Sequence, residues 1–120
     1  MGMFSWLRRS PSEEGSGRMT RADRKAVTVE LADWAAARHG VEIFVEPKTA
    51  VTETSVVLVA HDGEFTRRRI ASPKAAQSFA HDHKLPIYDA TVIGYPQRMR
   101  DYSRRQTLLR ERADREALGD

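Results

Sequence analysis

Three strand patterns follow one another between residues 41 and 70, and they constrain the fold more than any other feature of the chain. In the first, residues 41–47, apolar and polar side chains alternate, as in a strand with one buried face. The second, residues 55–60, is apolar on both faces, which favours a central position in a sheet. The third, residues 64–70, contains three consecutive arginines. The patterns predict a sheet of three or four strands.

A turn sequence joins the second and third strands. Asp-Gly, at positions 62 and 63, is favoured in two-residue hairpin loops because glycine adopts a positive φ angle without steric cost. A loop of this length would place Ala60 opposite Phe65 and Leu58 opposite Arg67. Alternation along the third strand then places three side chains on one face of the sheet: Phe65, Arg67 and Arg69.

Two helices are predicted on either side of the strands. The first begins at Thr20, which forms a weak capping pair with Asp23, and ends at the glycine before the first strand. The second begins at Ser72, with Pro73 in its first turn. Apolar residues recur at helical spacing in both, so each helix should bury one face. The expected buried residues are Val27, Leu31, Trp34 and Ala35 in the first helix and Ala75, Ala76, Phe79 and Ala80 in the second.

The remainder of the chain predicts a short strand region and a long helix. Residues 87–89 and 91–93 have the composition of one or two short extended pieces, and residues 94–96, Gly-Tyr-Pro, should break the chain. An arginine-rich helix should then begin near Gln97 and run towards Leu118. Four residues would line one side of it: Met99, Tyr102, Leu109 and Ala113.

These elements predict an α+β fold. Its core should be helix–strand–strand–strand–helix, with an antiparallel-rich sheet covered by helices on one face, a short extra strand and an Arg-rich C-terminal helix. We expect a disordered N-terminal tail at 1–18, one α+β domain at 19–96 and a charged helix at 97–120. The tail is assigned as disordered because its Ser-, Gly- and Glu-rich composition lacks apolar periodicity.

The composition narrows the chemistry. The chain has no cysteine, which excludes disulfides, cysteine-ligated metal centres and thiol catalysis, and favours a cytoplasmic location. It has no glycine-rich cofactor loop, and no cofactor is expected. No apolar run approaches the roughly 20 residues of a membrane span, so no integral membrane contact is expected. With 20 basic and 17 acidic residues, the net charge of +3 permits a phosphate-rich partner.

Candidate catalytic residues are few. His81 and His83 lie two positions apart on a helix and therefore point in different directions, which predicts no metal site. Glu42 and Glu46 share one strand face, and residues 46–48, Glu-Pro-Lys, resemble the Glu-x-Lys motif of metal-dependent nucleases. The proline would break the strand that holds such a carboxylate. In the other interpretation, both glutamates form ion pairs with arginines of the third strand.

Arginines concentrate on the third strand and the C-terminal helix. A guanidinium group matches the geometry of phosphate, and tyrosine rings stack on bases. A charge-rich helix is more often only a solvated face with internal salt bridges. Threonines at 49, 52 and 54 either cap their own turn or bind a phosphate. The residues predicted to contact nucleic acid or an acidic partner are Arg67, Arg69, Lys74, Tyr95, Arg98, Arg100, Tyr102, Arg104 and Arg105.

The order of the elements resembles that of double-stranded RNA-binding domains. Residues 72–76, Ser-Pro-Lys-Ala-Ala, look like the basic helix start with which that family binds phosphates at a helix N-terminus. The sequence has one lysine, Lys74, where the family has several, and it lacks the family's glycine-bearing turn before the helix. The resemblance implies RNA binding at the start of the second helix.

Two segments, 45–54 and 87–100, resemble a group of small uncharacterised actinobacterial proteins. The first reads Val-Glu-Pro-Lys-Thr-Ala-Val-Thr-Glu-Thr, and the second includes Gly-Tyr-Pro-Gln-Arg-Met-Arg. The resemblance covers residues 27–103, and such proteins are sometimes labelled oxidoreductase. It implies no site residue here, because the sequence has no cysteine, glycine-rich loop or metal-binding set.

We therefore expect a small, basic, non-enzymatic binding module that contacts nucleic acid or an acidic protein surface through the third strand and the C-terminal helix. The alternative is a protein-interaction or assembly module, in which the C-terminal helix forms a homodimer through its apolar side. An oxidoreductase or a metal-dependent nuclease is a further alternative.

Overall fold

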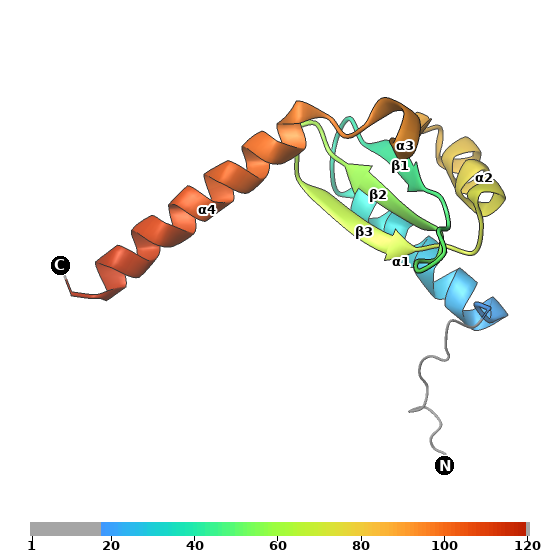
Figure 1. The fold of residues 1–120 in the computed structure, drawn as a ribbon, viewed down its shortest axis with the longest axis horizontal. Helices are drawn as coiled ribbons and strands as arrows, with labels where there is room; N and C mark the ends of the chain where they lie inside the picture. The colour runs from blue at the N-terminus through green and yellow to red at the C-terminus, as the bar shows by residue number, and fades with distance from the viewer. Residues whose placement is uncertain (1–17, 120) are drawn as a thin grey trace, which may run out of the picture.

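The computed structural model describes residues 18–119 of the chain. In this range the elements are α1 (Arg21–Ala36), β1 (Glu42–Glu46), β2 (Ser55–Val59), β3 (Phe65–Arg69), α2 (Pro73–His83), β4 (Ile87–Asp89), α3 (Ala90–Ile93) and α4 (Gln97–Ala117) (Figure 1). The predicted α+β fold, with its helix–strand–strand–strand–helix core, is confirmed. The tail predicted to be disordered, 1–18, lies outside the described residues except for Arg18.

The strands form one mixed sheet with the order β3-β2-β1-β4. β1 pairs antiparallel with β2, and β2 with β3, whereas β4 pairs parallel with β1. A parallel neighbour requires a crossover connection, and α2 lies in the connection that leads from β3 to β4 (Figure 1). β2 lies inside the sheet, as its apolar residues on both faces predicted.

The hairpin between β2 and β3 has a three-residue loop, and the predicted two-residue loop is wrong. The N–H of Ala60 donates to the carbonyl at the far end of the loop, 2.8 Å away, which leaves residues 61–63 between the strands. Phe65 consequently lies opposite Val59, and the rest of the register shifts with it. Gly63 has a φ of 95° at the third loop position, where such a loop requires a positive φ.

One face of the sheet is covered by α1 and α2. Leu31 of α1 packs there with residues of α2 and with four strand residues: Ile43, Val45, Val56 and Leu58. The predicted apolar faces of both helices are thereby confirmed. Phe79 is buried as predicted, whereas Trp34 is only partly buried. The capping predictions also hold, because Thr20 forms a capping box and Ser72 caps α2.

The opposite face of the sheet carries a smaller apolar cluster. Phe44, Val57 and Val59 are buried there, and partly buried residues from β3, β4 and the start of α4 pack against them: Phe65, Tyr88, Ala90, Tyr95 and Met99. Because neighbouring strand residues point to opposite faces, the one-residue shift in the hairpin places Arg67 on this side, away from Leu58. Arg67 and Arg69 therefore lie on the face of the sheet opposite the α1–α2 core.

Residues 91–93 are helical, so the second extended piece predicted there is wrong. They belong to the single turn α3, which directly follows β4. The carboxylate of Asp89 accepts hydrogen bonds from the N–H and the hydroxyl of Thr91, at 2.8 and 2.6 Å. The hydroxyl and N–H of Thr91 lower the pKa of Asp89. Such a side-chain bond to the nearby backbone favours a turn over a continued strand.

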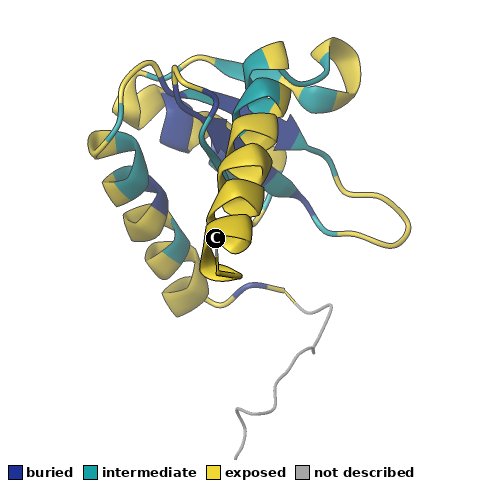
Figure 2. Ribbon diagram, turned by 90° about the vertical axis from the view of Figure 1, so that its left-hand side faces the viewer, coloured by how far each residue is buried: buried dark blue, intermediate teal, exposed yellow. Residues whose placement is uncertain are grey.

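α4 projects away from the domain (Figure 1). Met99 and Tyr102 are partly buried at its base, whereas every residue from Ser103 to Leu118 is exposed (Figure 2). We call residues 106–117 the outer segment of α4. At about 1.5 Å per residue, this segment extends about 18 Å. The predicted apolar side of the helix is therefore buried only at its first two positions.

Candidate functional site

A polar cluster lies on the second face of the sheet, around Glu46 at the end of β1. Glu46 accepts two hydrogen bonds from Arg67 of β3, from Nε and Nη2, each at 3.0 Å. It also accepts from the hydroxyl of Ser55 at 2.5 Å and from the hydroxyl of Tyr95. Four hydrogen bonds therefore occupy the two carboxylate oxygens, and the ion pair predicted between Glu46 and the third strand is confirmed.

Strand alternation explains how these residues meet. Glu46 lies directly opposite Ser55 on β2. Arg67 lies two residues along β3 from Arg69, the residue opposite Ser55, and a long side chain spans such a diagonal. Tyr95 reaches the cluster from the loop between α3 and α4. Four segments that are distant in sequence thus supply one network.

The carboxylate of Glu46 is firmly ionised. Partial burial raises the pKa of Glu46, but the hydrogen bonds from Arg67, Ser55 and Tyr95 outweigh burial and lower this pKa to about 2. Burial and the hydrogen bond to Glu46 raise the pKa of Tyr95, while the hydrogen bond to Glu46 raises the pKa of Arg67. All three groups therefore keep their protonation states near neutral pH. The cluster orients side chains and is not poised to transfer protons.

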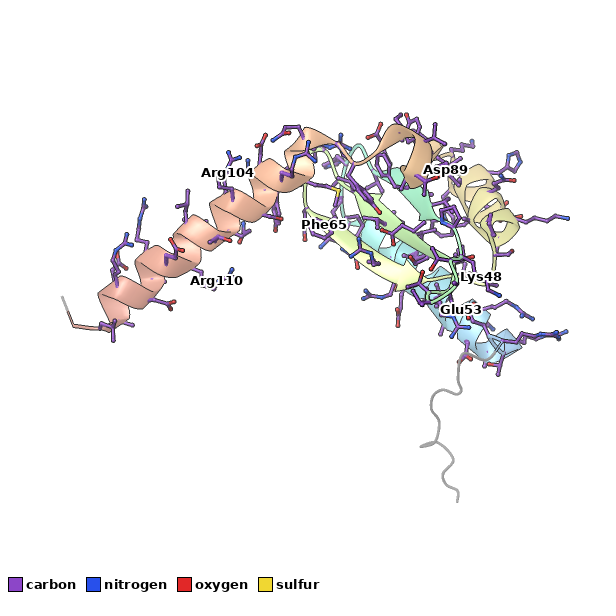
Figure 3. The ribbon with its side chains drawn as sticks, viewed as in Figure 1. Lys48, Glu53, Phe65, Asp89, Arg104 and Arg110 are labelled. Atoms are coloured by element: carbon purple, nitrogen blue, oxygen red, sulfur yellow. The ribbon has the colours of Figure 1, made fainter. Side chains whose placement is uncertain are left out.

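Two hollows adjoin this cluster, and Arg67 and Tyr95 line both of them. The first, of about 330 Å³, lies between β3 and the base of α4, and its other lining residues are Phe65, Met99, Arg100 and Ser103. Figure 3 shows Phe65 close to the base of α4. The second, of about 500 Å³, includes several hydroxyl-bearing residues: Thr49, Thr52, Ser55 and Thr91. Volumes of this size are typical of sites for small ligands. We call the two hollows together the Tyr95 groove.

Arginines attach the base of α4 to the domain. Arg98 donates to the carbonyl of Ala60 at 2.9 Å and to Glu42 at 2.5 Å, so the predicted pairing of Glu42 with the third strand is wrong. Arg105 donates to a carbonyl of the hairpin loop at 3.0 Å. A Cβ at Gly63 would lie only 1.9 Å from the carbonyl oxygen of Arg98. Glycine is therefore required where the hairpin meets α4.

The charge of α4 is unevenly distributed. Residues 97–110 contain five arginines and one acidic residue, a net charge of +4 (5 − 1), whereas residues 111–117 contain two arginines and three acidic residues, a net charge of −1 (2 − 3). Arg100 and Arg104 are four residues apart, so they lie on the same side of the helix. Arg104 and Arg110 point to opposite sides (Figure 3). The positive charge is greatest beside the Tyr95 groove.

The exposed arginines of α4 have few carboxylate partners. The side chain of Arg104 is 67% exposed, and the contact of its guanidinium with Asp101 is long, at 3.6 Å. Arg100 donates to the side-chain oxygen of Gln97, at 2.6 Å, and not to a carboxylate. Within residues 18–119, Arg110 forms no ion pair. The guanidinium groups of Arg100, Arg104 and Arg110 can therefore bind an anionic ligand without breaking a strong ion pair.

The structure separates the predicted binding residues into three groups. Arg67, Tyr95 and Arg100 line the Tyr95 groove, and Arg104 follows one turn further along α4. The residues that hold the base of α4 are Arg98, Tyr102 and Arg105. The remaining two lie elsewhere: Arg69 lines a hollow beside α1, and Lys74 is in the first turn of α2, on the other side of the sheet.

Several groove residues were not predicted as site residues, among them Phe65, Met99 and Glu46. Phe65 shares a strand face with Arg67, so its alternation was the signal that could have identified it. Met99 was assigned only to a dimer surface, because its packing against β3 depends on a contact far away in sequence. Glu46 was considered as a catalytic carboxylate or as half of an ion pair, and neither interpretation revealed that it also holds Tyr95.

The threonine loop after β1 forms hydrogen bonds within its own turn. The hydroxyl of Thr49 accepts hydrogen bonds from the N–H groups of Val51 and Thr52, at 3.2 and 3.0 Å, so the turn-capping interpretation of this loop is confirmed. Among residues 18–119, no group of three or more His, Asp or Glu side chains is placed to hold a metal ion. The carboxylate oxygens of Glu46 already accept four hydrogen bonds, which leaves it unsuited as a metal ligand.

None of the helices in the described part of the chain has the length and apolar character needed to cross a membrane. Comparisons with protein-family models, with curated proteins and with solved structures found no match. The geometry of the Tyr95 groove and the charge of α4 are therefore the basis for assigning a function.

Proposed function

We propose that this chain is a non-enzymatic, cytoplasmic module that binds the phosphate backbone of nucleic acid through the base of α4 and the adjoining Tyr95 groove. The main observation is the concentration of arginines where a projecting helix leaves the domain, with Arg67, Arg100 and Arg104 close to one groove. Guanidinium groups donate paired hydrogen bonds to phosphate and remain charged at any physiological pH. A backbone with regularly spaced phosphates can contact Arg100 and Arg104 directly, and Arg67, whose Nε and Nη2 are bound to Glu46, through its remaining N–H groups.

The order of charges along α4 supports an anionic ligand at its base. The N-terminal end of a helix carries a partial positive charge, so each basic residue there is unfavourable by about 0.3–1 kcal/mol. α4 has no acidic residue in its first turn and no side-chain cap, and Arg98 and Arg100 lie at this end. A bound phosphate would offset the repulsion, since helix N-termini favour anions. Because Glu42 already offsets the charge of Arg98, the charge that a bound phosphate would offset at this end is that of Arg100.

Fluorescence anisotropy of labelled single- and double-stranded oligonucleotides, measured at increasing salt concentration, tests the proposal. Three phosphate contacts predict that the logarithm of the association constant falls against the logarithm of the salt concentration with a slope of about 2–3. Absence of binding to DNA and RNA of either form, even at low salt, would show that the arginines are only a solvated surface.

A pair of double variants localises the contact. Arg100→Gln with Arg104→Gln removes two charges beside the groove and should reduce the slope by about 1.4–1.8. Arg110→Gln with Arg112→Gln removes the same charge from a region further along α4 and should leave the slope nearly unchanged. Equal losses in the two variants would contradict binding at the base of the helix, because they would reflect net charge alone.

A second candidate function is self-association through the outer segment of α4. The apolar side of α4 is partly buried at Met99 and Tyr102 and continues to Leu109. Leu108 and Leu109 are 55% and 54% exposed. A second copy of α4 could cover these leucines. Sedimentation equilibrium distinguishes this candidate: a dimer that Leu109→Asp converts to a monomer supports it, and a monomeric wild-type chain excludes it.

A further inference from the structure

We infer that the nucleic acid binds as a single strand, with one unstacked base inserted in the 330 Å³ hollow between β3 and α4. The inference rests on the proposed function and adds a base contact to its phosphate contacts. It assigns ligand-binding roles to Phe65, Tyr95 and Met99, which provide apolar surface beside the arginines.

The floor of the hollow suits the flat face of a base. Phe65, Tyr95 and Met99 are each partly buried, because they pack on the cluster below while also lining the hollow. Aromatic side chains in such positions stack on bases of any sequence, since every base presents a π-face. The thioether of methionine adapts its shape to an aromatic neighbour. The surface therefore recognises a base without selecting its identity.

The rim of the hollow suits the backbone attached to that base. Arg67 and Arg100 line it from β3 and from α4, and Ser103 adds a hydroxyl. Apolar surface next to two guanidinium groups matches a base together with its attached phosphates. In a duplex the base faces are stacked and inaccessible, and only groove edges and phosphates remain exposed. The hollow therefore favours a single strand, whose bases can be splayed out.

Glu46 fixes the shape of the site before the ligand arrives. Its carboxylate accepts two hydrogen bonds from Arg67 and one from the hydroxyl of Tyr95, so both side chains are held in place. Side chains that are already ordered lose less entropy on binding. The same two residues also line the hydroxyl-rich hollow of about 500 Å³, which can receive a neighbouring sugar. Because the ionised Glu46 lines this hollow as well, the phosphates remain beside Arg67 and Arg100.

An oligothymidine and a matched oligomer with abasic sites separate base binding from backbone binding, because both carry the same number of phosphates. The abasic oligomer should bind at least about tenfold more weakly to the wild-type chain, with an unchanged salt slope. Tyr95→Leu should lower affinity for oligothymidine by about tenfold, whereas Tyr95→Phe, which keeps the ring, should lose less than about threefold. Circular dichroism checks that each variant is folded.

The outcomes distinguish this inference from the proposed function. Equal affinity for the abasic and the complete oligomer, or tighter binding of the duplex than of the single strand, would overturn the base site while backbone binding stands. Failure of every oligomer to bind at low salt would overturn the proposed function itself. The abasic comparison needs no variant of the protein, so it remains decisive if Tyr95→Leu fails to fold.

Discussion

On the α1–α2 side of the sheet, eleven buried residues form one apolar cluster, whereas on the other side three buried apolar residues lie between two ion pairs. These pairs, Glu42 with Arg98 and Glu46 with Arg67, join β1 to α4 and to β3. These partly buried pairs contribute only about 1–2 kcal/mol each, less than the apolar cluster contributes. Their directional hydrogen bonds instead fix where Arg67, Tyr95 and the base of α4 lie. The face covered by α1 and α2 mainly stabilises the fold. The opposite face mainly positions Arg67, Tyr95 and the base of α4.

Substitution of neighbouring valines on β2 compares the two faces most directly. Val56 and Val57 are 1% and 0% exposed and point to opposite faces of the sheet. Val56→Ala should cost about 3 kcal/mol, because its surroundings are close-packed and cannot fill the cavity. Val57→Ala should cost about 2 kcal/mol, because the partly exposed Met99 can move towards the space. Urea unfolding measures both values.

Equal or reversed costs for the two valines would contradict this comparison and would show that the second face is packed as tightly as the first.

Gly63→Ala tests how the hairpin holds α4. The φ of 95° and the overlap with the carbonyl oxygen of Arg98 should together cost about 2–3 kcal/mol and release the base of the helix. Gly94→Ala is the matched control, since Gly94 also has a positive φ, of 75°, but an added Cβ would meet no atom within 4 Å. Gly94 has a ψ of −169°, in a region that only glycine occupies readily, so the control should lose about 1–2 kcal/mol from backbone strain alone. Equal losses would mean that contact with α4 is unimportant.

Glu46→Gln tests the polar cluster through its pH dependence. The folded-state pKa of Glu46, about 2, lies below the ordinary value of 4.5, so its contribution to stability is complete above pH 4.5 and is lost as the pH falls towards 2. The variant should be about 1–2 kcal/mol less stable than the wild type at neutral pH. The difference should disappear near pH 2. A difference that persists there would indicate lost packing and not lost charge.

Local signals in the sequence predicted the elements well. Thr20 with Asp23, and Ser72 with Pro73, determine helix starts through bonds within one turn, so no distant contact is needed. The turn at residues 61–63 was harder, because Asp-Gly suits both a two-residue loop and a three-residue loop that ends in glycine. The choice between them depends on the register of whole strands. The difference of one residue in loop length determines which face of the sheet carries Arg67 and Arg69.

The groove could not be predicted in the same way. Arg98 and its partner Glu42 are 56 positions apart, and Tyr95 and Glu46 are 49 apart. Whether an arginine is free or bound in an ion pair follows from such contacts, so the list of predicted binding residues mixed the two kinds. Arginine density showed which elements carry charge, but the fold determines which guanidinium groups remain accessible.

The outer segment of α4 has a consequence for how this protein unfolds. All of its side chains are exposed, so its helix depends on local interactions, and an isolated helix of about 12 residues is marginal in water. Such a segment exchanges between helix and coil in about a microsecond, while β2 opens only when the whole domain does. The ellipticity of the helix band on heating therefore combines two processes: the gradual melting of the outer segment and the sharp unfolding transition of the domain. In a Trp6→Phe variant, the remaining emission is that of Trp34, which packs on the core and reports the unfolding of the domain alone.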